Sequence, residues 1–109
     1  MATTYKVLGQ SNPAATTATT LYTVPSATQA VVSTIAVCNQ AATAATYRIA
    51  IRPAGATLAA QHYIAYGSTV AANDSTMLTI GVTLATTDVI TVYASTATLS
   101  FSAFGSEIA

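Results

Sequence analysis

The sequence predicts an all-β protein, an antiparallel β-sandwich of seven or eight short strands with jelly-roll or Greek-key connections. Apolar side chains recur at every second position in short segments, which is the period of a strand. Turn signals built from Pro, Gly, Asn, Asp and Ser separate those segments at short intervals. Thr accounts for 21 of the 109 residues, and its branched Cβ favours strands over helices.

Residues 1–16 are predicted to form an extended N-terminal arm or an edge strand, and residues 17–109 a single sandwich domain. Residues 5–8 have the pattern of a short strand. Pro13 and the small polar residues around it favour extended or irregular backbone. This composition slightly favours an arm that lies on a neighbouring subunit.

Residues 30–53 are predicted to be the central hairpin, two strands joined by a long exposed loop. Alternation places one set of side chains of the first strand on a common face: Val31, Ser33, Ile35 and Val37. The second strand separates an apolar face, Tyr47, Ile49 and Ile51, from a face with Arg48, Ala50 and Arg52.

Further strands are expected over residues 20–24, 62–66, 76–82, 89–94 and 97–104. Gly67 and Ser68 should end the strand over 62–66, because Gly weakens a strand interior. The strand over 76–82 should place Leu78, Ile80 and Val82 on one face. Residues 56–61 are the one segment with a pattern that allows a helical turn, although six residues are too few for a stable helix.

The chain is almost free of charge. Its 24 Ala and 21 Thr make 45 of 109 residues, and charged residues make up 6% where roughly 25% is usual. The surface must therefore consist mainly of Thr, Ser, Asn, Gln and Ala. One interpretation is a neutral, Thr-coated soluble domain; the other, which we prefer, is a subunit whose neighbours cover its surface, since little charge repulsion keeps its copies apart.

No motif indicates an enzyme, a cofactor or a metal site. His62 is the only histidine and Cys38 the only cysteine, and Cys38 is expected to be a small buried side chain. Asp74 and Asp88 fall in turns, where a carboxylate caps backbone amides. The glycines are isolated, so no phosphate-binding loop is expected.

Nucleic-acid and membrane partners are not expected either. The basic residues are scattered, which argues against a nucleic-acid surface. The N-terminal residues lack the apolar segment of a signal peptide, and no run of 18 apolar residues occurs. The chain is therefore expected to be made and kept in the cytoplasm until it is assembled.

The candidate contact residues lie on one strand face and in two loops. Arg48 and Arg52 share a side of their strand and are predicted to make intersubunit contacts, together with Tyr5 and Lys6. Loops over 39–46 and 67–74 should be exposed, with candidate contacts Asn39, Gln40, Thr43, Asn73 and Asp74. Tyr63 and Tyr66 are candidates to flank a ligand, although packing or interface use is the commoner role of tyrosine.

Several runs resemble a family of small virion and tail-associated proteins of tailed phages, including cyanophages. They are LYTVPSATQAVVSTIAVCNQ, RIAIRPAG, AANDSTMLTIGVTLATTDVITVYA and LSFSAFGSEI, and the resemblance extends from about residue 6 to residue 108. Its most characteristic motifs are YTVP at 22–25, VCN at 37–39, RPAG at 52–55, AND at 72–74, DVI at 88–90 and FGSE at 104–107. These are turn and strand-edge residues.

The resemblance implies a β-sandwich with no catalytic set and no cofactor. It implies a structural protein of the phage particle, either a capsid decoration or cement protein or a component of the tail, neck or baseplate. Its partners would be other virion proteins, and phage symmetry suggests a trimer or hexamer. The alternative is a receptor-binding tip module whose loops contact host glycans or proteins; an enzyme such as a glycan hydrolase has too few acidic residues.

Overall fold

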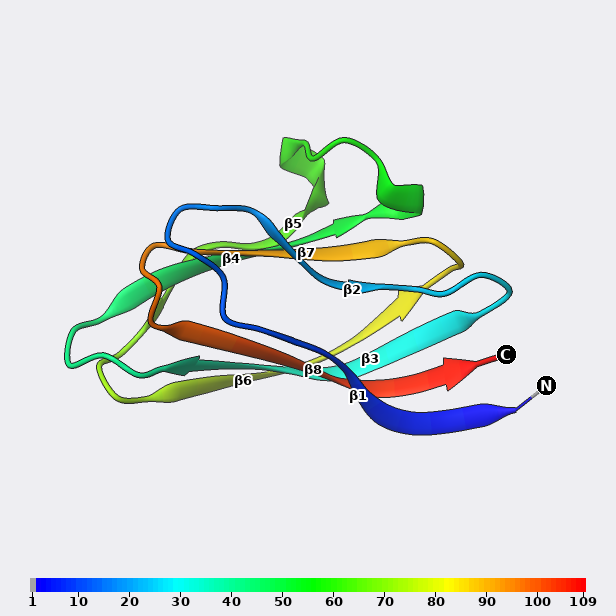
Figure 1. Cartoon of the computed structure of the whole chain (residues 1–109), viewed down its shortest axis with the longest axis horizontal. Helices are drawn as coiled ribbons and strands as arrows, with labels where there is room; N and C mark the ends of the chain where they lie inside the picture. Colours follow the sequence, from blue (N-terminus) through cyan, green and yellow to red (C-terminus); the bar gives the residue numbers. More distant parts are fainter. Residues whose placement is uncertain (1) are drawn as a thin grey trace.

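Two four-stranded antiparallel sheets pack face to face in the computed structural model, which describes residues 2–109. Sheet A has the order β1-β8-β3-β6 and sheet B the order β2-β7-β4-β5 (Figure 1). The strands are β1 (Thr3–Ser11), β2 (Thr19–Thr23), β3 (Gln29–Asn39), β4 (Ala45–Arg52), β5 (Tyr63–Val70), β6 (Ser75–Leu84), β7 (Val89–Ala94) and β8 (Leu99–Ile108). Two single 3₁₀ turns, η1 (Pro53–Gly55) and η2 (Ala60–His62), lie between β4 and β5.

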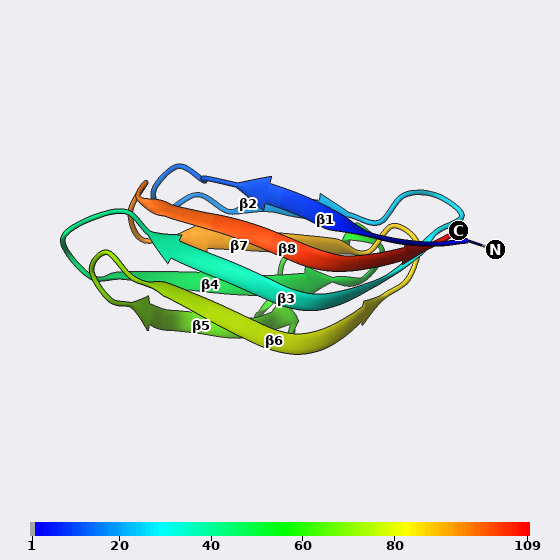
Figure 2. The same cartoon turned by 90° about the horizontal axis from the view of Figure 1, so that it is seen from below.

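The strand pairing follows the jelly-roll pattern. Four of the hydrogen-bonded pairs are β1 with β8, β2 with β7, β3 with β6 and β4 with β5, so the first half of the chain runs antiparallel to the second half. Successive strands mostly alternate between the sheets. β5 and β6 are the edge strands of the two layers at one side of the sandwich, and β2 and β1 are those at the other (Figure 2). The predicted all-β sandwich is therefore confirmed.

Alternating side chains from both sheets fill the space between the layers. The largest fully buried side chains include Phe101, Ile35 and Leu99 from sheet A and Ile49 and Ile90 from sheet B. The rings of Tyr47 and Phe101 meet edge to face across the layers, with centroids 6.2 Å apart. As predicted, Tyr47 and Ile49 point inward from β4 while Arg48 lies on the outer face.

A row of β-bulges crosses sheet A. Leu8 is an extra residue of β1 opposite β8, Ser33 is an extra residue of β3 opposite β8, and Ile80 and Gly81 together face Ser33. A bulge bends its strand and increases the local twist, and β3, β6 and β8 bend in the middle of their length (Figure 2). The bulge at Ser33 breaks the predicted alternation of β3.

All four edge strands of the sandwich are bulged. In β2 the extra residue is Leu21, and in β5 Gly67 and Ile64 are extra residues opposite β4. Bulged edges pair poorly with an additional strand, and this is a common way in which sheets avoid edge-to-edge association. The broad outer faces of the sheets are therefore better suited to partners than the edges.

The faces of β3 and β6 differ from the prediction because of these bulges. Val32, Ile35 and Val37 form the buried face of β3, whereas Val31 lies on the opposite side of the strand. Ile80 is exposed instead of sharing a buried face with Leu78 and Val82.

Other predictions need correction at the level of connectivity. The predicted central hairpin is wrong, because β3 belongs to sheet A and β4 to sheet B. Residues 3–11 form β1 at the edge of sheet A, paired with β8; this is the edge-strand alternative of the prediction for residues 1–16, so this strand is part of the sandwich and not an arm. The strand β5 continues through Gly67 to Val70, and β8 extends to Ile108.

Two side chains were assigned to the wrong environment. Cys38 lies on the outer face of β3 and is exposed rather than buried. Asn39, expected in an exposed loop, ends β3 on its inner face and is 1% exposed. Within residues 2–109, no helix has the length and apolar character needed to cross a membrane.

The close approach of strands at the bulges predicts a large cost for a methyl group at Gly105. A Cβ added there would lie 1.9 Å from the carbonyl oxygen of Val31, a backbone atom that cannot move aside. Gly105→Ala should therefore lower the free energy of unfolding by more than about 3 kcal/mol, measured by chemical denaturation.

Gly81→Ala is the matched control. Gly81 has a positive φ of 58°, but an added Cβ there meets no atom within 4 Å. Gly81→Ala should lower the free energy of unfolding by about 1–2 kcal/mol, which is the cost of a left-handed backbone conformation at a residue with a Cβ. Equal losses in the two variants would contradict the close approach of β3 and β8.

Candidate functional site

Arg48 lies between two tyrosine rings on the outer face of sheet B. Its guanidinium carbon Cζ is 4.2 Å from the centroid of the Tyr66 ring and 4.2 Å from that of the Tyr93 ring. Tyr63 adds an edge-to-face contact with Tyr66, at a centroid distance of 4.9 Å. We call these four residues the Arg48 cluster. Cation–π contacts of this kind hold a planar guanidinium in a fixed orientation.

Strand register creates the cluster. Arg48 is on β4, between β5 and β7, and both Tyr66 and Tyr93 are its direct cross-strand partners. In a regular strand, residues 63 and 66 would point to opposite faces. The extra residue Ile64 lies between them, so that Tyr63 and Tyr66 both lie on the outer face, opposite Ala50 and Arg48. Bulges often re-aim a side chain in this way next to functional sites.

The loop over residues 53–62 rises from sheet B beside the cluster and folds back over part of its outer face (Figure 1). It covers Ala50, Val89 and Thr91, which are buried although they lie on the outer side of their strands. An open groove of about 650 Å³ remains between this loop and β5. Its lining residues are Leu58, Ala59, Ala60, Tyr63 and Tyr66.

Arg52 holds this loop in place. Its Nε donates to the carbonyl of Ala56 at 2.7 Å, one terminal nitrogen donates to the carbonyl of Gly55 at 3.0 Å, and the other donates to Thr91 Oγ1 at 3.3 Å. Asp88 accepts the backbone N–H of Ala54 at 2.8 Å, which ties η1 to the β6–β7 turn. Arg52 therefore has a clear role within its own chain, and its predicted intersubunit contact stays a prediction.

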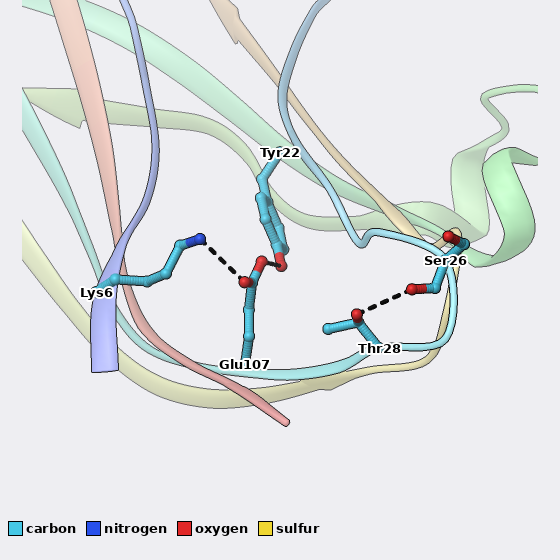
Figure 3. A network of polar contacts seen from close by, with 5 residues as sticks. All are labelled: Lys6, Tyr22, Ser26, Thr28 and Glu107. Carbon is cyan, nitrogen blue, oxygen red and sulfur yellow. Dashed lines mark hydrogen bonds and ion pairs between the residues drawn. The ribbon is translucent and has the colours of Figure 1, made fainter. Parts of the chain in front are cut away.

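A second polar cluster links the two sheets near the chain termini (Figure 3). Tyr22 from β2 donates its hydroxyl to Glu107 Oε2 at 2.5 Å, and Lys6 Nζ from β1 lies 3.0 Å from Glu107 Oε1. The hydrogen bond from Tyr22, with that from Lys6, lowers the pKa of Glu107. Burial, together with the Glu107 carboxylate, raises the pKa of Tyr22. Both carboxylate oxygens have partners, which favours a structural link between the sheets.

Asn39 is a structural hub rather than a loop contact. Its side-chain Nδ2 donates to the carbonyl of Thr43 at 2.9 Å and lies 3.3 Å from that of Val70. Its Oδ1 accepts the N–H of Ala41 at 3.0 Å and the hydroxyl of Thr98 at 3.2 Å. One buried amide therefore fixes the β3–β4, β5–β6 and β7–β8 loops at one end of the sandwich.

The other predicted contact residues lie on the surface but do not form one site. Gln40 and Thr43 are exposed in the β3–β4 loop, and Asn73 and Asp74 are exposed in the β5–β6 turn. Asp74 Oδ1 accepts the N–H of Ser75, which is the capping role predicted for it. Tyr5 is 84% exposed on the outer side of β1.

The residues with catalytic potential are dispersed. His62 Nδ1 accepts the N–H of Ala59 within the loop over 53–62. In the part of the chain that the structure describes, no group of three His, Cys, Asp or Glu residues is close enough to hold a metal ion. The Arg48 cluster offers a fixed planar cation, which suits recognition of an oxyanion.

Sequence reasoning found only part of this cluster. It placed Arg48 on an outer face and noted Tyr63 and Tyr66, but it did not connect them with Tyr93. The available signal was the apolar and aromatic pattern on both sides of the strand over 89–94, which indicated a central strand but not its neighbours.

The link between Tyr22 and Glu107 leads to a pH-dependent prediction. Tyr22→Phe removes the hydrogen bond to a largely buried carboxylate and should cost about 1.5–3 kcal/mol of unfolding free energy at neutral pH. The pKa of Glu107 is lower in the folded state, so its contribution is present above the unfolded carboxyl pKa and is lost as pH falls through the folded pKa. The difference between wild type and variant should therefore shrink in acid.

Chemical denaturation at several pH values measures this difference. Tyr5→Phe is the control, because this ring is exposed and its change should cost less than about 0.5 kcal/mol. A pH-independent loss in Tyr22→Phe would show that its hydroxyl acts without the ionised Glu107.

No protein-family model, curated protein or solved structure matches this chain. The resemblance to phage virion proteins therefore stays a prediction.

Proposed function

We propose that this chain is a non-enzymatic structural protein of a tailed-phage particle and that it acts through protein–protein contacts. It would be made in the host cytoplasm and reside in the virion, as a capsid decoration protein or as part of the tail, neck or baseplate. The observation that carries the proposal is the uncharged outer face of sheet A.

Five of the six charged residues lie away from that face, and Lys6 lies at its edge, on β1. Lys6 pairs with Glu107 of the same sheet, Arg48 and Arg52 lie on the outer side of sheet B, and Asp74 and Asp88 lie in turns. The outer face of sheet A presents instead uncharged side chains from all four of its strands. They include Tyr5, Val7, Val31, Thr34, Ala36, Cys38, Met77, Thr79, Ser100, Ser102, Phe104 and Ser106.

The low charge of this face and its exposed Tyr and Met are features of the centre of a protein interface. Interface cores are depleted of charge and enriched in aromatic residues and Met. Tyr5 is 84% exposed and Met77 is 63% exposed at opposite edges of the face, and Val7 is also exposed. Of the charged side chains only Lys6 borders this face, so a partner that covers it would desolvate little charge, which lowers a major cost of burial.

The assignment to a phage particle has separate support. It rests on the resemblance of the turn motifs to small virion proteins. The jelly roll is common in viral capsid proteins and adds support by analogy, although it also occurs in lectins and enzymes.

A receptor-binding module is the second candidate. The exposed loops with Gln40, Thr43, Asn73 and Asp74, and the free guanidinium of Arg48, favour this alternative. Purified protein that binds host cells would support a receptor-binding role, whereas protein that binds phage heads or tails lacking it would support the structural role.

A charged side chain on the outer face of sheet A should disrupt assembly. Met77→Lys should weaken self-association at least about tenfold, because a lysine would be desolvated in the interface. Analytical ultracentrifugation over a wide range of concentrations measures the effect.

Gln61→Lys is the matched control. It adds the same charge at an exposed position of η2, on the sheet B side, and should leave self-association unchanged. A wild-type chain that stays monomeric at every concentration, and that mass spectrometry does not find in particles of the phage encoding it, would overturn the proposal.

A further inference from the structure

The two arginines of sheet B differ in how their hydrogen-bond donors are used. Arg52 donates to two backbone carbonyls and one hydroxyl. Arg48 is held by stacking alone, and none of the other residues that the structure describes accepts a hydrogen bond from it or pairs with its charge. No buried side-chain nitrogen lacks a partner in this part of the chain, so the free nitrogens of Arg48 reach solvent.

The shape of this site favours a carboxylate. Tyr66 and Tyr93 cover the two faces of the guanidinium, so its N–H groups are available only around the edge, in the plane of the group. A carboxylate is planar and accepts two parallel hydrogen bonds from such an edge. A phosphate dianion would carry a second charge, and the nearest other cation on this face, Arg52, already serves the 53–62 loop.

The groove next to Arg48 suits the body of the ligand. Its walls are the rings of Tyr63 and Tyr66 and the small apolar side chains of Leu58, Ala59 and Ala60. Tyr66 is shared between the groove and the arginine, so a ligand held by Arg48 reaches the groove directly. Aromatic walls with one oriented polar group are typical of small-ligand sites, and the hydrocarbon face of a pyranose ring packs well on a tyrosine.

We propose that the Arg48 cluster binds an acidic saccharide, with the carboxylate of a hexuronate on the guanidinium edge of Arg48 and the sugar ring in the groove beside Tyr63 and Tyr66. The site is on the sheet opposite the proposed assembly face, so each proposal can fail without the other. The rival ligand is a carboxylate of a second copy, Asp74, whose side chain is exposed in the β5–β6 turn.

The test is titration of the isotopically labelled full chain with short oligomers of galacturonate, mannuronate and glucuronate, followed by NMR. At least one should shift the Arg48 Nε–H signal and the amide signals of Tyr66 and Tyr93. The corresponding neutral oligosaccharide should bind at least about tenfold more weakly, because it lacks the charge-assisted contact.

Variants distinguish binding at the Arg48 cluster from a general effect of positive charge on the protein. Arg48→Lys keeps the charge but loses the planar stack, and should weaken binding at least about tenfold. Arg48→Gln should abolish it. Lys6→Gln removes one positive charge from the opposite sheet and should leave binding unchanged. If Arg48→Gln fails to fold, the loss of binding expected in Arg48→Lys still tests the proposal.

Three outcomes would overturn the proposal. One is that none of the acidic oligomers binds, and another is that neutral and acidic oligomers bind equally well. The third is loss of self-association in Arg48→Glu and in Asp74→Arg, with recovery when the two variants are mixed. That recovery would identify the partner of Arg48 as Asp74 of a second copy.

Discussion

Strict alternation of side chains along each strand is the constraint on which this structure depends. One residue faces the core and the next faces outward, so an extra residue exchanges the two faces for the rest of the strand. The bulge at Ser33 keeps Val32 on one side of the bend, and Ile35 and Val37 on the other, on the inner face of β3. In β5, the extra residues Ile64 and Gly67 place two tyrosines on the outer face.

The same alternation gives the two outer faces different side-chain compositions. Sheet A presents hydroxyl, methyl and a few large apolar groups to its surroundings. Sheet B carries Arg48 and Arg52, three tyrosines and the loop over 53–62. The chain has only six charged residues, and strand register decides on which face of a sheet a charged strand residue lies. Register places Arg48 on the outer face of sheet B, where its guanidinium can bind a partner. This separation makes one face suitable for assembly and the other for recognition.

Polar groups inside the sandwich connect elements that the apolar core does not hold. Asn39 joins three loops at one end, and Glu107 joins β1, β2 and β8 near the chain termini. Each of these groups has several hydrogen-bond partners, so its burial leaves little unpaired polarity. The two ends of an Ala- and Thr-rich sandwich are thereby fixed without a disulfide or a metal among residues 2–109.

The features that depend only on the local alternation of side chains could be predicted from the sequence. The fold class, the position of β7 and the two faces of β4 follow from period-two patterns that run without interruption. The pattern could not reveal the bulges at Ser33 and Gly67, because a bulge is defined by the opposite strand. The error in the β3–β4 hairpin has a similar cause. Two successive strands have the same sequence pattern whether they pair in one sheet or pack across the core from different sheets.

Long-range pairing also explains what was missed in the site. Asn39 has the composition of a loop residue, and only its partners in two distant loops make its burial favourable. Tyr93 is 45 positions from Arg48 in the chain, and register alone brings them together. A spacing of three places Tyr63 and Tyr66 on opposite faces of a regular strand, and the extra residue Ile64 between them reverses this.

The most direct test of this account is the register between β4 and β5 in solution. Cross-strand nuclear Overhauser effects between backbone protons report which residues are paired. The account predicts contacts of Arg48 with Tyr66 and of Ile49 with Ala65. Contacts of Ile49 with Tyr66 would mean a strand without the Gly67 bulge and a tyrosine that points into the core, and would contradict both the Arg48 cluster and the role assigned to the bulges.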